Sequence, residues 1–294
     1  MLIDKHSDSK LTITSPAKVN LFLEVLGKRN DGYHDIHSLF QAVSLYDILE
    51  FEITSTPSVE ISIKGADNIP TDTSNLISKA YRVMQSRFGF SAGLTVSLDK
   101  KIPSGAGLGG GSGNAAATLL ACSILFNLAL SREALAKLSL KIGSDIPFFF
   151  SLGQAVIGGR GEVVDDIALP LDYWLVLVTP QLHLSTAEAY AGLRMGLTKE
   201  ATLISFGGCR TTEELIACLA EAGNDFEPIQ FVAHPILGRI AAMLVDSGAS
   251  LVRMSGSGST IFGIFSTAPE TERWANGRLH DWAVFTVRPI RLPA

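Results

Sequence analysis

The stretch from Pro103 to Asn114 constrains this chain most, because six of the nine residues from Gly105 to Gly113 are glycine. An alternating apolar pattern at 94–98 predicts a strand before it, and the alanine-rich run after it predicts a helix. A strand, a glycine loop and a helix start direct backbone N–H groups and the positive end of a helix dipole at an anion. We therefore interpret the stretch as a phosphate-binding loop. Apolar segments flank it directly, which disfavours a flexible linker.

The loop does not by itself identify the phosphate compound. A P-loop ends in Gly-Lys-[Ser/Thr], which is absent here. Gly105, Gly107 and Gly110 match the Gly-x-Gly-x-x-Gly of dinucleotide-binding folds, a weak match in so glycine-rich a run. The acidic residue that this fold requires about 20 residues later would be Glu133, which lies in a predicted helix. A nicotinamide-dependent oxidoreductase therefore stays as an alternative.

The composition narrows the class of protein. A length of 294 residues suggests about two domains, and 47% hydrophobic against 18% charged residues indicates a globular chain. The net charge of −5 without a basic block argues against a nucleic-acid surface. Three cysteines without metal-ligand spacing and a polar N-terminus lead us to expect a cytoplasmic protein with no membrane partner. The oligomeric state stays open between monomer and homodimer.

Strands and helices are mixed in both halves of the chain, which predicts an α+β fold of two lobes that meet near residue 160. The expected strands are 11–14, 15–25, 49–53, 59–63, 94–98, 155–157, 174–178, 251–254, 260–265 and 284–288. The expected helices are 75–88, 115–130, 131–142, two that start at 185 and 211, 234–247 and 269–282.

Two candidate polar groups lie near apolar segments. Lys18 and Asn20 are two residues apart in a predicted strand, so their side chains share one face. They form either a polar site or an ordinary solvated face. Asp145 precedes the apolar run Phe148–Phe150, and an unpaired charge is costly to bury. Asp145 is therefore a helix cap, a surface residue or the partner of a cation.

Two further motifs suggest ligand contacts. Asp31-Gly32 predicts a turn that presents Tyr33 and His34, whose rings could bind a flat ligand. His34 and His37 have a spacing that is only weak evidence for a metal site, so metal ligands stay unassigned. A second glycine loop, Ser255–Ser259, joins two predicted strands and is also consistent with a simple hairpin.

Three segments together resemble the GHMP kinase superfamily. They are Pro16-Ala17-Lys18-Val19-Asn20-Leu21, the loop 103–114, and Met254-Ser255-Gly256-Ser257-Gly258-Ser259. The element Asp31-Gly32-Tyr33-His34 is not expected in homoserine or mevalonate kinases. It therefore narrows the resemblance to a branch of the superfamily whose small-molecule substrate carries a cytidine diphosphate. Gly143–Phe148 agrees with that branch. Gly113 departs from the family loop, which usually has a second serine there.

The resemblance implies a fold and a reaction. The fold is an N-terminal lobe like ribosomal protein S5 domain 2 over residues 1–160 and a ferredoxin-like lobe over 161–294. The reaction is phosphorylation of a substrate hydroxyl by ATP with Mg²⁺. Another GHMP-type kinase, of the homoserine or mevalonate type, and a nucleotide-binding module without turnover stay as alternatives.

The resemblance also implies residue roles. Asp145 would accept the proton of the attacking hydroxyl, and Lys18 would stabilise that carboxylate and the transferred phosphoryl group. The other implied contacts are Tyr33 and His34 for cytosine, Asn20 and Thr186 for the sugar alcohol and its phosphates, and Asn75 and Lys100 near adenine. The ATP phosphates would lie on Pro103, Ser104, Gly105, Ala106, Gly107, Leu108, Gly109, Gly110, Gly111, Ser112 and Gly113.

Overall fold

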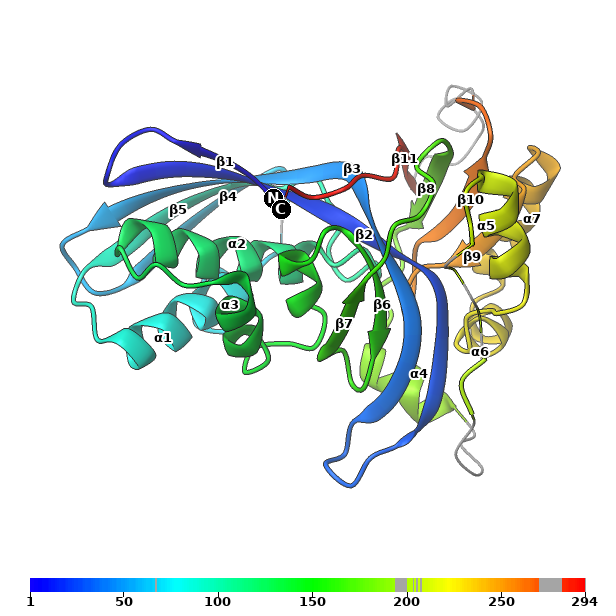
Figure 1. Cartoon of the computed structure of the whole chain (residues 1–294), viewed down its shortest axis with the longest axis horizontal. Helices are drawn as coiled ribbons and strands as arrows, with labels where there is room; N and C mark the ends of the chain where they lie inside the picture. Colours follow the sequence, from blue (N-terminus) through cyan, green and yellow to red (C-terminus); the bar gives the residue numbers. More distant parts are fainter. Residues whose placement is uncertain are drawn as a thin grey trace.

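The computed structural model of the chain describes residues 1–66, 68–193, 200–202, 204, 206, 208–269 and 282–293. These residues form two β-sheets with helices packed against them (Figure 1). The two-lobed α+β architecture that the sequence predicts is therefore confirmed.

The first sheet has seven strands, with β6 and β7 added beside β3. Its strands are β1 (Leu2–Lys5), β2 (Lys10–Lys28), β3 (His34–Thr54), β4 (Val59–Lys64), β5 (Gly93–Asp99), β6 (Gln154–Gly158) and β7 (Val163–Asp166). Helices α1 (Leu76–Phe88), α2 (Gly110–Leu125) and α3 (Arg132–Ser139) lie on one side of it in Figure 1. Phe51 and Tyr81 are fully buried in this lobe, and each such side chain contributes about 1.5–3 kcal/mol to stability.

The second sheet has four antiparallel strands in the order β11-β8-β10-β9. These are β8 (Trp174–Pro180), β9 (Leu251–Met254), β10 (Ile261–Phe265) and β11 (Trp282–Val287). The helices of this half are α4 (Thr186–Gly192), α5 (Thr212–Ala220), α6 (Glu227–Ala233) and α7 (Pro235–Asp246). The capping-box spacing at Thr211 is confirmed, since Thr211 and Glu214 exchange both hydrogen bonds at the start of α5.

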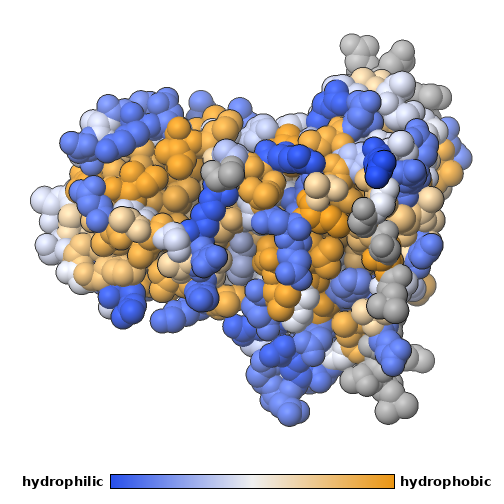
Figure 2. Space-filling view, in the orientation of Figure 1, coloured by the Kyte–Doolittle hydropathy of each residue, from blue (hydrophilic) through white to orange (hydrophobic). Residues whose placement is uncertain are grey.

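Strands β2 and β3 are much longer than the sequence suggests. Their apolar pattern is interrupted at register shifts, for example between Pro16 and Ala17, so only fragments of each strand show clean alternation. The two strands run beyond the sheet as a hairpin that ends at Asp31-Gly32 (Figure 1). Gly32 has a φ of +86°, which confirms the predicted turn, and the projecting tip is largely hydrophilic in Figure 2.

Several predicted boundaries need correction. The helix predicted over 115–130 begins earlier, at Gly110 within the glycine loop, and ends at Leu125. Asn127 and Ala129 have positive φ angles, so the chain leaves the helix before the apolar run ends. Most of the helix predicted over 269–282 lies outside the described residues. The division at residue 160 stays a prediction: the first sheet continues to Asp166, and residues 289–292 return to contact it.

The topology excludes the dinucleotide-binding alternative. That fold needs a parallel sheet, with the glycine loop between a strand and the helix that leads to the next parallel strand. Among the described strands, only β4 and β5 pair in parallel, and β5 precedes the glycine loop next to the antiparallel β3. Within the described part of the chain, no single helix is long and apolar enough to cross a membrane; α6 and α7, bent by 114°, meet that test only as a pair.

Candidate active site

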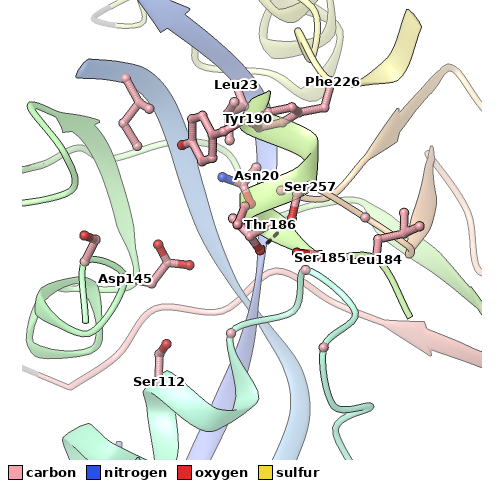
Figure 3. Close-up of a pocket in the computed structure, with 18 of the residues that line it drawn as sticks. Asn20, Leu23, Ser112, Asp145, Leu184, Ser185, Thr186, Tyr190, Phe226 and Ser257 are labelled. Carbon is pink, nitrogen blue, oxygen red and sulfur yellow. Dashed lines mark hydrogen bonds between the residues drawn. The ribbon is translucent and has the colours of Figure 1, made fainter. Parts of the chain in front are cut away.

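A cavity of about 1180 Å³ lies where the glycine loop, β2, the tip of the β2–β3 hairpin and α4 come together. Figure 3 shows part of its lining, with Ser112 on α2 extending toward Asp145. Six residues predicted from distant parts of the sequence line this one space: Lys18, Asn20, Tyr33, His34, Asp145 and Thr186.

The glycine loop adopts a backbone that only glycine accommodates easily. Gly105, Gly107 and Gly109 have φ angles of +66°, +78° and +70°, in the left-handed region. A methyl group on Gly107 would overlap the carbonyl oxygen of Ser255 in the second glycine loop. Gly107 therefore lets the two glycine loops pack against each other.

Hydrogen bonds fix the loop at both sides. The Lys18 N–H donates to the carbonyl of Leu108 at 2.9 Å, and the Thr260 N–H donates to the carbonyl of Ala106 at 3.2 Å. These bonds connect the loop to β2 and to the start of β10. A flexible linker is thereby excluded.

The loop leads into the N-terminus of α2, which faces the cavity. The N-cap residue, Gly109, makes no side-chain capping bond, so the first-turn N–H groups are open to an anion. Most of the predicted phosphate-binding residues line the cavity: Pro103, Gly105, Ala106, Gly107, Gly109, Gly110, Gly111 and Ser112. Ser104 lines a smaller adjoining pocket, Leu108 is buried, and Gly113 faces the interior.

The departure at Gly113 has a packing reason. A methyl group on Gly113 would lie 2.5 Å from the hydroxyl oxygen of Ser15 and 3.1 Å from the ring of Phe149. The Ser15 hydroxyl is buried and has no hydrogen-bond partner among the described residues. In this chain Ser15 therefore occupies the space that a serine at position 113 would need.

Lys18 and Asp145 meet inside the cavity. The Lys18 Nζ lies 3.3 Å from Asp145 Oδ2, and the Lys18 side chain is 3% exposed while that of Asp145 is 39% exposed. The helix-cap interpretation of Asp145 is wrong, because the 3-10 turn Pro147–Phe150 has Ile146 at its N-cap and no side-chain capping bond. Asp145 is an accessible carboxylate beside a buried cation.

Asn20 holds the Lys18 ammonium in place. Lys18 Nζ donates to Asn20 Oδ1 at 2.7 Å, and Asn20 Nδ2 donates to Ser38 Oγ at 3.1 Å. The Asn20 N–H donates to Ser255 Oγ at 3.2 Å, and that hydroxyl donates to the Gly107 carbonyl at 2.9 Å. Lys18 and Asn20 are both buried, so the solvated-face interpretation is wrong.

Aromatic side chains surround the other end of the cavity. The Tyr33 side chain at the hairpin tip is 49% exposed. The rings of His34 and Tyr190 stack with centroids 4.5 Å apart, and Tyr190 meets Phe226 edge-on at 4.9 Å. Tyr190 on α4 was not predicted; its position four residues after Thr186, on the same face of that helix, was the available signal. This end of the cavity suits a flat ring.

The protonation states at this end follow from burial. Burial, and secondarily the charge of Lys28, lowers the pKa of His34 below its usual 6.5. At neutral pH the neutral ring therefore offers one donor and one acceptor. Burial, with a smaller contribution from Asp145, raises the pKa of Tyr190 to about 12, so Tyr190 keeps its proton.

The second glycine loop connects β9 and β10 as a hairpin and also lines the cavity. Its Ser257 Oγ lies 3.0 Å from Thr186 Oγ1, the interaction that is dashed in Figure 3. Asn224, buried before α6, donates from Nδ2 to the carbonyls of Met254 and Gly256 at 2.7 and 2.8 Å. These bonds set the position of Thr186 in the cavity.

Asn75 and Lys100 lie outside the cavity lining. Asn75 caps α1, its Oδ1 accepting from the Ile77 N–H at 2.9 Å. Lys100 Nζ donates to Asp47 Oδ2 at 2.6 Å and to the Ile102 carbonyl, directly beneath Gly110. Contact of either residue with adenine stays a prediction.

The Lys100–Asp47 pair is expected to support the loop from below. Both side chains are almost fully buried, at 4% and 0% exposed, so Lys100→Met leaves the buried Asp47 carboxylate without its cation. We expect the free energy of unfolding in urea to fall by about 3–5 kcal/mol. Lys101→Met is the control: its ammonium is 57% exposed and lies 3.8 Å from Asp99, so its loss is expected to cost less than about 1 kcal/mol. Equal stability of both variants would contradict this role of Lys100.

Two family models match the chain. Residues 75–153 match the GHMP kinases N terminal domain, and residues 209–275 match the GHMP kinases C terminal domain. The first match covers α1, the glycine loop and Asp145, and the second begins just before α5 and ends after β10.

Named relatives and solved structures agree with these models. A protein of Syntrophus aciditrophicus (strain SB) named 4-diphosphocytidyl-2-C-methyl-D-erythritol kinase is 41% identical, over 95% of this chain and 99% of its own. The like-named protein of Bacillus cereus (strain AH187) is 35% identical, over 91% and 92%. A crystal structure of 4-(cytidine 5'-diphospho)-2C-methyl-D-erythritol kinase matches with a TM-score of 0.72, 31% identity and coverage of 94% and 99%. Homoserine kinase from Cytophaga hutchinsonii also matches at 0.72, covering 99% and 98%, but its 18% identity shows the fold alone.

Proposed function

The chain belongs to the GHMP kinases and, within them, to the 4-diphosphocytidyl-2-C-methyl-D-erythritol kinases, and from that premise we propose the reaction and its residues. The chain is an ATP-dependent small-molecule kinase. The proposed reaction transfers the γ-phosphoryl group of ATP to the C2 hydroxyl of 4-(cytidine 5'-diphospho)-2-C-methyl-D-erythritol, a step of non-mevalonate isoprenoid precursor biosynthesis.

One observation carries this proposal. A single cavity has a glycine loop at one end, the rings of Tyr33, His34 and Tyr190 at the other, and Asp145 in its lining. A nucleotide-linked alcohol can place its base among the rings while its hydroxyl reaches the carboxylate. A homoserine- or mevalonate-type substrate has no ring to place there.

In the proposed mechanism Asp145 accepts the proton of the attacking hydroxyl. Its carboxylate is exposed to the cavity and therefore reachable by substrate. The Lys18 ammonium, held by Asn20 Oδ1, stabilises negative charge on the carboxylate and on the transferred group. Buried positive charge acts strongly here because little water screens it.

The loop amides and the start of α2 would bind the phosphates of ATP. The cradle fits such a group, because its glycines take the positive φ angles that bring the loop backbone to the cavity beside the start of α2. Mg²⁺ typically keeps water and phosphate ligands and takes only one or two protein oxygens. Asp145 and Ser112 are suitable donors, although the described residues contain no cluster of three metal-ligating side chains. When bound, Mg²⁺ offsets phosphate charge.

The direct test measures ADP release with 4-(cytidine 5'-diphospho)-2-C-methyl-D-erythritol, homoserine and mevalonate as separate acceptors. We expect release only with the cytidine compound. Release with either other acceptor alone, or ATP binding without release for any acceptor, would contradict the proposal. We also propose a cytoplasmic location, because none of the three cysteines in this structure is part of a disulfide.

Stacking at the hairpin tip leads to a prediction for Tyr33. Tyr33→Ala removes the exposed ring, and base–aromatic stacking contributes about 1–3 kcal/mol. We expect the KM of the cytidine substrate to rise about 10- to 100-fold while the KM of ATP stays unchanged. Steady-state kinetics with each substrate varied in turn measures both values. Tyr33→Phe is the control and should keep a nearly normal KM; an equal loss in both variants would assign the effect to the hydroxyl.

A further inference from the structure

The β6–β7 turn lies against both ends of the proposed acceptor site. The Gly161 N–H closes the turn on the Gly158 carbonyl at 3.1 Å, and the Ile36 N–H of β3 donates to the Gly159 carbonyl at 2.7 Å. A methyl group on Gly161 would lie 2.5 Å from the carbonyl oxygen of Ser144, the residue before Asp145. The turn is therefore packed tightly between the strand that follows Tyr33 and the segment that carries the carboxylate.

Arg160 projects from this turn into the cavity lining. Its Cζ lies 4.6 Å from the centre of the Tyr33 ring, in a cation–π arrangement. The neighbouring carboxylate of Glu162 accepts from the backbone N–H of Arg160 and from Arg29, at 2.5 and 3.5 Å. Within the described residues no carboxylate lies within ion-pair distance of the Arg160 guanidinium. Arg160 therefore keeps donors available for a ligand.

The charges of the cavity favour an anionic ligand near this turn. Three cations line it, Lys18, Lys28 and Arg160, against the single carboxylate of Asp145 among the described lining residues. Lys18 is already paired with Asp145, which leaves Lys28 and Arg160 at the end with the rings. In the proposed substrate, a ribose and a diphosphate connect the base to the reacting alcohol.

We propose that Arg160 is a specificity residue that binds the diphosphate of the acceptor through its guanidinium while its flat face holds the Tyr33 ring. The inference rests on the proposed function. A guanidinium suits both tasks, because it presents several donors in one plane to phosphate oxygens and stacks on an aromatic face. Lysine offers neither the planar fork nor the stacking surface.

Substitution kinetics tests the proposal first. Arg160→Gln is expected to raise the KM of the cytidine diphosphate acceptor about 10- to 100-fold, the range for hydrogen bonds to a charged group. The KM of ATP and kcat are expected to change less than about threefold, since the Arg160 guanidinium contacts the Tyr33 ring and not Asp145 or the glycine loop. For Arg160→Lys, the KM of the acceptor should lie between the values for the unaltered protein and for Arg160→Gln. Arg87→Gln is the matched control, because Arg87 lies 6.0 Å from the Phe88 ring, is exposed and does not line the cavity.

A binding series identifies the diphosphate as the partner. Calorimetry with cytidine, CMP and CDP should show that Arg160→Gln weakens the binding of CDP at least tenfold and the binding of cytidine less than threefold. Equal weakening of both ligands, or of neither, would overturn the proposal, the first result meaning that Arg160 only supports Tyr33. If Arg160→Gln and Arg160→Lys melt at the same temperature as the unaltered protein, misfolding does not cause the loss of binding. Absence of turnover by the unaltered protein with the cytidine substrate would instead refute the proposed function, and the binding series still tests Arg160.

Discussion

Asp145→Asn is expected to lower kcat by about 10²- to 10⁴-fold, the contribution of a positioned proton acceptor. The amide keeps the shape of the side chain but cannot accept the proton of the substrate hydroxyl. Lys18 Nζ retains its bond to Asn20 Oδ1 and its position 4.4 Å over the Phe40 ring, so the buried ammonium keeps partners and the fold should persist. ATP should still bind, because the glycine loop is not altered. Single-turnover kinetics separates the chemical step from substrate binding.

Asp99→Asn is the matched control for this prediction. Asp99 is 40% exposed and has a lysine partner at 3.8 Å, much like Asp145, but it lies outside the cavity lining. Its replacement should leave kcat within about twofold, as for surface pairs in general. If Asp145→Asn turned over at the normal rate, Asp145 would have no part in proton transfer. An equal loss in the control would point to a general effect of lost charge.

Local sequence was sufficient for the parts of the site that depend on backbone conformation. The glycine-rich stretch 105–113 between a strand and a helix predicted a cradle, and the structure has left-handed φ angles at Gly105, Gly107 and Gly109. The Asp31-Gly32 turn and the shared face of Lys18 and Asn20 also follow from short-range rules. Each of these features is decided within a few residues of chain.

Contacts between distant segments could not be predicted in this way. The family resemblance implies that Lys100 lies near adenine, but no local rule indicates that Asp47 on β3 binds its ammonium. Tyr190 and Arg160 reach the cavity from elements more than 100 residues beyond Tyr33. The length of β2 and β3 was missed because bulges break the period of two on which strand prediction depends. The placement of these residues and strands depends on contacts with distant segments, and not on local secondary-structure propensity.

Gly107→Ala is the second large effect that the geometry predicts. The native φ of +78° costs a non-glycine residue about 1–2 kcal/mol, and the new methyl group would overlap the Ser255 carbonyl oxygen. The loop must therefore shift away from the second glycine loop. Because a displacement of about 1 Å can cost 10²-fold in rate, we expect kcat/KM for ATP to fall about 10²-fold or more. The melting temperature should fall as well.

Gly111→Ala separates this effect from loss of glycine in general. Gly111 lies in the first turn of α2 with no positive φ, and a methyl group there meets no atom closer than 3.4 Å, the Leu76 Cδ1. Alanine favours the helix by about 0.5–1 kcal/mol, so this variant should unfold at higher urea concentration than the unaltered protein. Gly107→Ala is thus expected to lower the stability of the fold, and Gly111→Ala to raise it. Normal ATP kinetics in Gly107→Ala would mean that contact between the two loops does not set the phosphate-binding geometry, and that the N-terminus of α2 alone is sufficient.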